Sequence, residues 1–174
     1  SGVVTAATVD LDAADGIGNT TALSLAVATI DADTTAAAAH IDIDNALGTA
    51  TELTSFTTIG AGANITFDQT GGGTLTITSI DTTDGAIDIS AASGDIVATL
   101  VVADGSNGIS LDTTTSGDIT LGALTAAGDT ITIDSAGAID DASVDALADL
   151  TASILDLDAV DGIGTTRPIE TVAA

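Results

Sequence analysis

Short runs of alternating apolar and polar residues recur along this chain at a regular spacing. Written from Ala63 in rows with a period of 22, the sequence sets large apolar residues in two columns, the first Ile65, Ile87, Ile109 and Ile131, the second Phe67, Ile89, Leu111 and Ile133. An Ile-x-Ile alternation is the period of a β-strand with one buried face. We therefore predict that these eight residues are buried and stacked in ladders.

The rows also predict how the strands are joined and stacked. Two further columns follow, one of Leu75, Val97 and Ile119 and one of Ile80, Val102 and Leu124. Ile139 falls out of column, and the spacing from Ile41 to Ile65 is two residues longer than the period of 22. Gly, Asp, Asn and Ser lie between the strands, as tight corners require. Strands this short bury a face only by stacking on neighbours. The prediction is an all-β chain, a parallel β-helix (β-solenoid) with coils of about 22 residues.

A longer repeat organises the chain. Val9 to Thr21 reads VDLDAADGIGNTT and Leu155 to Arg167 reads LDLDAVDGIGTTR, identical at nine of 13 positions at an offset of 146. We divide the chain into an N-terminal module (1–62), regular coils (63–150) and the start of a repeated module (151–174, a copy of 9–28), all in one continuous solenoid. The repetition favours a segment that was cut from, or polymerises into, a longer array.

Composition excludes several classes of protein. The net charge is −25, yet 45% of the residues are hydrophobic, so a disordered acidic chain is a poor interpretation. Arg167 is the only Lys or Arg, which argues against nucleic acid and anionic membranes as partners. No apolar run is long enough for membrane insertion. Ser1-Gly2-Val3-Val4 does not read as a signal peptide, so we expect that a leader was removed or that the sequence is an excerpt.

Two acidic clusters are candidate calcium sites. Asp10, Asp12 and Asp15 precede Gly16, and Asp156, Asp158 and Asp161 precede Gly162 in the same spacing. Calcium is bound by six to eight hard oxygens, and closely spaced Asp residues before a turn supply several. The alternative is that these side chains point to solvent from strands whose Leu residues point inward. A predicted column of Asp68, Asp112, Asp134 and Asp156, interrupted by Ser90, either recruits cations or consists of corner residues that accept backbone hydrogen bonds.

Other functions receive weaker support from the sequence. His40 and Asp42 alternate outward together, but no motif surrounds a nucleophile, so we assign no catalytic residue and do not expect an enzyme. A carbohydrate-active β-helix would need aromatic or basic groups that are scarce here. An ice-binding face would need continuous Thr columns, but Asp88 and Ser110 separate Thr66 from Thr132.

A resemblance to a known group follows from the Gly-Ile-Gly modules. Asp161-Gly162-Ile163-Gly164 leads into Arg167-Pro168-Ile169-Glu170-Thr171, whereas the first copy leads into Ala22-Leu23-Ser24-Leu25. The second copy resembles the giant bacterial β-strand-repeat surface proteins, relatives of filamentous haemagglutinin-like adhesins. The resemblance implies a secreted, extracellular, cell-surface location and a role as a fibre or adhesin stalk, with host or surface glycans as candidate partners. It transfers no catalytic residue and no cofactor, so calcium remains the only candidate cofactor.

The ends of the solenoid carry the last expectation. Val144, Leu147 and Leu150 have a weak helical spacing within Asp141 to Leu150, but no capping helix is evident at the N-terminus. Open solenoid ends expose unpaired backbone groups. Because the last segment copies the first, we predict head-to-tail filaments in which Leu155 to Ala174 stacks on the N-terminal region of another copy.

Overall fold

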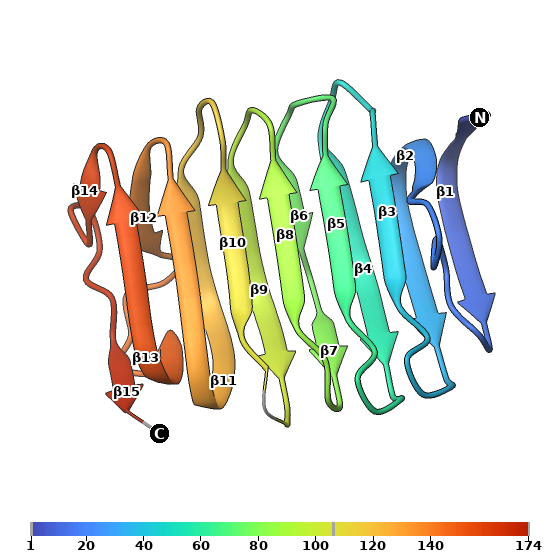
Figure 1. Ribbon diagram of the computed structural model, residues 1–174. Helices are drawn as coiled ribbons and strands as arrows, with labels where there is room; N and C mark the ends of the chain where they lie inside the picture. Colours follow the sequence, from blue (N-terminus) through green and yellow to red (C-terminus); the bar gives the residue numbers. More distant parts are fainter. Residues whose placement is uncertain (1, 106, 174) are drawn as a thin grey trace.

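The chain winds into one parallel β-solenoid of about eight turns, with its two ends at opposite ends of the rod (Figure 1). The structure is a computed structural model that describes residues 2–105 and 107–173. Within these ranges the regular elements are all strands, and every pairing between strands is parallel. The predicted fold class and the coil length of about 22 residues are confirmed.

Fifteen strands of the described chain form a single sheet that closes on itself turn by turn. They are β1 (Val4–Ala13), β2 (Leu23–Thr34), β3 (Ile41–Asn45), β4 (Thr51–Thr58), β5 (Ile65–Gln69), β6 (Leu75–Ile77), β7 (Ile80–Thr82), β8 (Ile87–Ala91), β9 (Ile96–Ala103), β10 (Ile109–Thr113), β11 (Ile119–Ser135), β12 (Ala138–Asp141), β13 (Leu150–Ala159), β14 (Gly162–Ile163) and β15 (Thr171–Ala173).

Each turn passes through three faces, which we number in chain order. The first face contains β3, β5, β8, β10 and the C-terminal ends of β11 and β13. The second face contains β6, β12, β14 and the N-terminal parts of β4, β9 and β11. The third face contains β7, β15, the remaining parts of β4 and β9, the middle of β11 and the start of β13.

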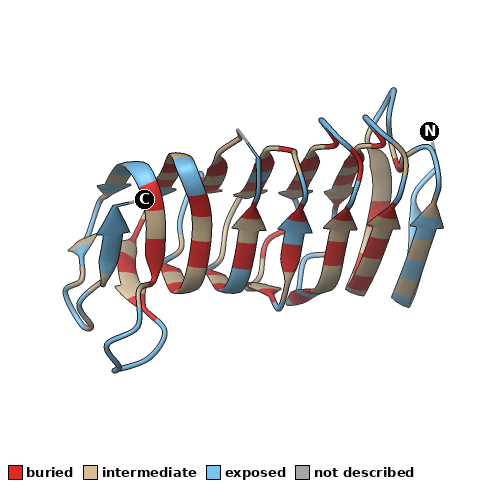
Figure 2. Cartoon of the chain, turned by 90° about the horizontal axis from the view of Figure 1, so that it is seen from below, coloured by how far each residue is buried: buried red, intermediate tan, exposed pale blue. Residues whose placement is uncertain are grey.

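The first face carries the predicted ladders. Ile109 pairs with Ile87 on one side and Ile131 on the other, and Leu111 is placed in the same way between Ile89 and Ile133. All eight predicted core residues are buried. Figure 2 shows buried and partly exposed residues alternating along the central strands. The two extra residues before Ile65 are also confirmed, because Ile41 pairs with Ile65 at an offset of 24.

The two other predicted columns were wrong by one position. Leu75 and Ile119 pair with Ile96 rather than Val97, and Ile80 and Leu124 pair with Val101 rather than Val102. The reason is a corner that is one residue shorter in this turn: Ile96 follows the end of β8, Ala91, by five positions, whereas Leu75 follows the end of β5 by six.

The predicted Asp column also changes at its last member. Asp112 pairs with Asp134, and Asp134 pairs with Asp158, whereas Asp156 pairs with Thr132. The offset between these coils is 24, because Ile131 pairs with Leu155. Ser90 lies between Asp68 and Asp112 as predicted, and Asp44 precedes Asp68 in the same column.

Buried polar side chains complete the interior at the corners. The hydroxyls of Thr34, Thr58 and Thr82 each donate to a backbone carbonyl of the following corner. Asn45 Nδ2 donates to Gln69 Oε1 at 2.9 Å, linking two coils inside the core. Satisfied groups of this kind avoid the cost of an unpaired buried dipole.

Glycine is required where corners stack most closely. A Cβ on Gly94 would lie 2.4 Å from the carbonyl oxygen of Gly73, and one on Gly117 would lie 2.0 Å from the oxygen of Gly94. Both residues also have positive φ, at 99° and 129°. Neighbouring corners can therefore lie a single strand spacing apart only because these positions lack a side chain.

The two copies of the repeated module lie on different faces. Leu11 is followed in its column, one coil at a time, by Ala32, Phe56, Ile80, Val101, Leu124 and Leu150 on the third face. Its counterpart in the second copy, Leu157, stacks on Ile133 on the first face. The offset of 146 between the copies therefore corresponds to six turns and one further face.

Neither end of the described solenoid is covered by a cap. β1 is mostly exposed along its length, and β14, β15 and the C-terminal half of β13 form the other open edge (Figure 2). The weak helical spacing within Asp141 to Leu150 does not give a helix. Residues 142–149 form a loop between β12 and β13 in which Val144 and Leu147 are 84% and 73% exposed.

Candidate functional site

The first predicted calcium cluster lies at the N-terminal edge. Asp10 and Asp12 are on β1 and pair with Asp31 and Asp33 of β2, and all three predicted residues, including Asp15 in the following corner, are exposed. Burial, more than the neighbouring carboxylates, raises the pKa of Asp33, although a hydrogen bond with Thr57 opposes the shift.

The second predicted calcium cluster lies at the C-terminal edge. Asp156 and Asp158 are on β13, where Asp158 pairs with Asp134, and Asp161 lies in the next corner, all three exposed. The strand alternation directs the Asp side chains outward while Leu155 and Leu157 pack against the core. Calcium binding at either cluster stays a prediction.

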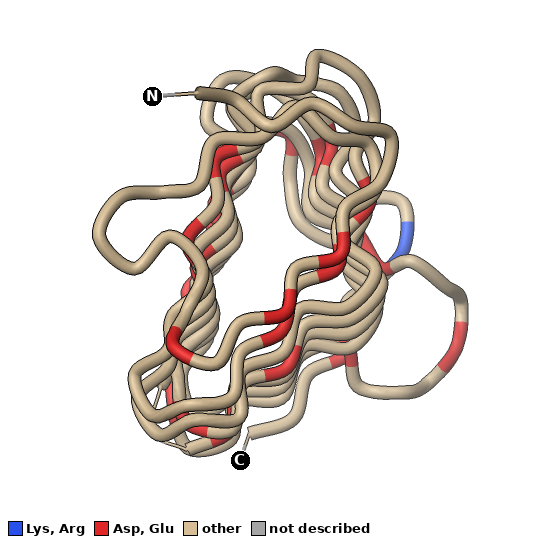
Figure 3. Tube along the Cα trace, turned by 90° about the vertical axis from the view of Figure 1, so that its right-hand side faces the viewer, with Lys and Arg blue, Asp and Glu red and all other residues tan. Residues whose placement is uncertain are grey.

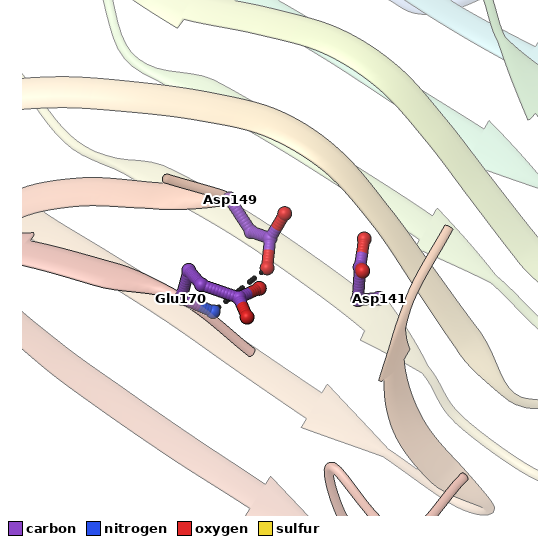
Figure 4. Close-up of side chains that lie close together, drawn as sticks. All are labelled: Asp141, Asp149 and Glu170. Carbon is purple, nitrogen blue, oxygen red and sulfur yellow. Dashed lines mark hydrogen bonds between the residues drawn. The ribbon is translucent and has the colours of Figure 1, made fainter. Parts of the chain in front are cut away.

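A third set of carboxyl groups meets inside the C-terminal part of the solenoid. Asp141 ends β12, Asp149 immediately precedes β13, and Glu170 immediately precedes β15. One ligand oxygen from each lies within 4.8 Å of the others, and within the described ranges this is the one group of three acidic or His side chains with such a geometry. Figure 4 shows the three carboxyl groups turned toward one another.

Stacking of adjacent coils explains how this group, which we call the carboxyl triad, is assembled. The loop of residues 142–149 leaves the solenoid wall at Asp141 and returns at Asp149. On the next coil, the backbone oxygen of Glu170 accepts hydrogen bonds from the N–H groups of Asp149 and Leu150. The base of the loop and the start of β15 therefore converge at one corner.

Asp141 and Asp149 are buried, Glu170 is partly exposed, and the triad is incompletely hydrogen-bonded. Asp141 and Asp149 are only 2% and 5% exposed. Asp141 Oδ1 accepts from the N–H of Ser143 at 2.9 Å, and Asp149 Oδ2 accepts from the N–H of Glu170 at 2.8 Å. Glu170 Oε2 is buried and has no hydrogen-bond partner.

Burial dominates the electrostatics of the triad. It raises the pKa of Asp149 from 3.8 to about 6; the backbone N–H of Glu170 opposes this shift, and the carboxylates of Asp141 and Glu170 add to it. A carboxyl group that is removed from water beside two others favours its protonated form. At neutral pH a negative charge on Asp149 therefore carries an energetic cost.

The single arginine of the chain does not neutralise this charge directly. Arg167 Nη1 donates to the backbone oxygens of Asp141 and Ala142, at 3.0 and 2.6 Å. These two bonds fix the start of the loop. On the outer surface, the N–H groups of Thr166 and Arg167 donate to Asp140 Oδ1 and help to lower the pKa of that carboxyl group.

His40 contributes to a shallow pocket of about 210 Å³ on the first face. Gly18, Asn19, His40, Asp42, Asn64 and Thr66 line this pocket. His40 Nδ1 accepts a hydrogen bond from the N–H of Asn64 at 3.0 Å, so one ring nitrogen already has a structural partner. The lining supplies one imidazole and one carboxyl group, as the outward alternation of His40 and Asp42 predicted.

Sequence reasoning missed the carboxyl triad for a physical reason. The three residues are up to 29 positions apart in the sequence. They meet because the offset between paired residues on the second face falls to 20, from Ile119 to Ile139, and a long loop follows. The usable signal was the acidic residues Asp141 and Asp149 at the two ends of one irregular segment.

Comparisons with known proteins give no relative for this chain. No protein family, curated protein or solved structure matches it. The described part of the chain also contains no helix that is long and apolar enough to cross a bilayer. Viewed along the rod, acidic residues occur on several sides of the solenoid wall (Figure 3).

Proposed function

We propose that this chain is an extracellular structural module of a cell-surface fibre or adhesin stalk, assembling head to tail with copies of itself. The observation that carries the proposal is the open backbone edge at each end of the described solenoid, formed by β1 at one end and by β13 to β15 at the other. Unpaired strand edges pair readily with further strands. A contact between two different ends does not close on itself and produces a filament.

Exposed apolar residues at both ends support the same proposal. Val3 and Val4 at the N-terminal edge and Val160, Ile163 and Val172 at the C-terminal edge are between 44% and 77% exposed. Leu11 and Leu157 are only partly buried because each has a neighbouring coil on one side alone. Stacking of a second copy would complete their ladders. Host or surface glycans remain candidate partners of the assembled fibre.

The chemistry of the faces favours a structural role over the alternatives. The outward column of Thr66, Asp88, Ser110 and Thr132 is mixed, whereas an ice-binding face would need regular Thr columns. We assign no catalytic residue, because the pocket at His40 is small and its imidazole already accepts a backbone hydrogen bond.

Assembly can be tested by sedimentation velocity and negative-stain electron microscopy of the purified chain. We expect filaments with a regular axial repeat. Leu157→Lys should prevent assembly, because it points a charge inward at the open edge. Leu100→Lys is the matched control, because Leu100 lies on a middle coil and is already 42% exposed. A chain that remains monomeric at high concentration, or filaments unaffected by Leu157→Lys, would contradict the proposal.

A further inference from the structure

The carboxyl triad brings three carboxyl groups together, and no cationic side chain of the described residues is paired with them. Asp141 and Asp149 are almost completely buried, and Arg167, the only Lys or Arg of the chain, bonds to backbone oxygens beside them. The backbone N–H groups of Ser143 and Glu170 donate to the triad, and a side-chain hydrogen bond joins Asp149 to Glu170. Buried carboxylates without a paired cation are strongly unfavourable, so a proton or a metal ion must compensate for them.

An independent observation points to a ligand rather than to a closed structural network. Glu170 Oε2 is shielded from solvent, belongs to the triad and has no hydrogen-bond partner. A buried acceptor in this condition loses its hydration without replacement. A cation beside it would supply the missing partner.

The dimensions of the triad suit a calcium ion. Two oxygens bound to one calcium ion at about 2.3–2.6 Å lie no more than about 5 Å apart, and the three ligand oxygens here lie within 4.8 Å of one another. Three carboxylates in mono- or bidentate modes provide three to six of the hard oxygens that calcium takes. A pocket of about 200 Å³ whose lining includes Ser143, Asp145 and Asp149 lies beside the site.

We propose that Asp141, Asp149 and Glu170 bind one divalent cation of the hard, oxygen-binding class, with Ca²⁺ as the expected ion. The site is distinct from the Asp10 and Asp156 clusters and does not depend on assembly into a fibre. The cation connects the base of the 142–149 loop to the coil that carries β15. Its structural effect is to hold this loop and the last coil in place.

The test is hydrogen–deuterium exchange of the full chain at pH 7.5, with Ca²⁺ or with NaCl at equal ionic strength. Calcium should slow exchange several-fold in residues 142–152 and 169–173. Asp149→Asn and Glu170→Gln should weaken Ca²⁺ binding by at least about tenfold, since even residues that only orient a metal ligand affect affinity by about 10–100-fold. Both variants keep their shape and lose a repelling charge, so folding should be retained.

The matched control is Asp88→Asn, which removes the same charge from an exposed outward position between Thr66 and Ser110. This variant should keep the calcium response of the loop and last coil. Three results would overturn the proposal: no calcium response in these segments, an equal response in Asp149→Asn, or protection produced by acidic pH but never by calcium. Because exchange is measured within each chain, failure here leaves the filament proposal to its own test.

Discussion

The central coils (residues 65–135) and the C-terminal coils (residues 138–173) share one solenoid wall but bury different kinds of side chain. In the central coils each Ile or Leu of the first face contacts the equivalent residue of the next turn. In the C-terminal coils an extended corner brings the carboxyl triad to a nearly buried position. Apolar ladders are insensitive to pH and ions, whereas buried carboxyl groups are not. One rod therefore combines coils that are held by apolar ladders with a coil that contains nearly buried carboxyl groups.

The largest expected difference between the two regions is their response to a charge in an apolar column. Ile109→Asp places an unpaired carboxylate between Ile87 and Ile131, and we expect a loss of roughly 3–5 kcal/mol in the free energy of unfolding. Leu157→Asp at the open edge should cost less than half as much, because its outer side contacts water. Urea denaturation of dilute monomer measures both. Equal losses in the free energy of unfolding would show that Leu157 is as well covered as Ile109, which would contradict an open edge.

The second prediction concerns pH and is confined to the C-terminal coils. The folded-state pKa of Asp149 is raised from 3.8 to about 6, so its protonation stabilises the fold fully below about pH 4, and this contribution is lost as the pH rises through about 6. In chelator, hydrogen exchange of residues 142–152 should accelerate severalfold between pH 5 and 7, after correction for intrinsic exchange. Asp149→Asn should remove most of this change. A variant that keeps the full pH response would assign it to other groups.

Removal of the arginine contacts should have a smaller and local effect. Arg167→Ala deletes the two bonds from Nη1 to the oxygens of Asp141 and Ala142, with an expected cost of about 1–2 kcal/mol. The loop of residues 142–149 should exchange faster while residues 65–135 remain unchanged. Arg167→Lys is the conservative variant and should restore part of the protection. Faster exchange in the central coils would refute the local role.

The smallest expected effect comes from the outward Asp column of the first face. Asp134 lies between Asp112 and Asp158, and burial together with Asp134 raises the pKa of Asp112. At low salt Asp134→Asn should raise the melting temperature slightly, which corresponds to a gain of less than about 1 kcal/mol in the free energy of unfolding. This gain should vanish in high salt. Asp88→Asn, whose column neighbours are Thr66 and Ser110, should gain less. Equal gains would exclude repulsion within the column.

Sequence periodicity predicted the first face because its spacing is constant through the central coils. Ile65, Ile87, Ile109 and Ile131 follow one another at a constant offset of 22 and need only alternation and stacking to be placed. The columns at Ile96 and Val101 were displaced because one corner is a residue shorter, and adjacent apolar residues such as Ile96 and Val97 do not reveal which one points inward. The carboxyl triad depends on corner lengths in two successive turns, which periodicity does not encode.

The placement of the repeated module on two different faces has a geometric consequence for any chain that continues it at the same spacing. Each recurrence advances by six turns and one of three faces, so three recurrences, or 19 turns, restore the starting azimuth after roughly 90 Å. Successive copies of the module would then follow a helical path around the rod and lie on each of the three faces in turn. The rod would therefore expose the module's acidic side chains on all of its sides.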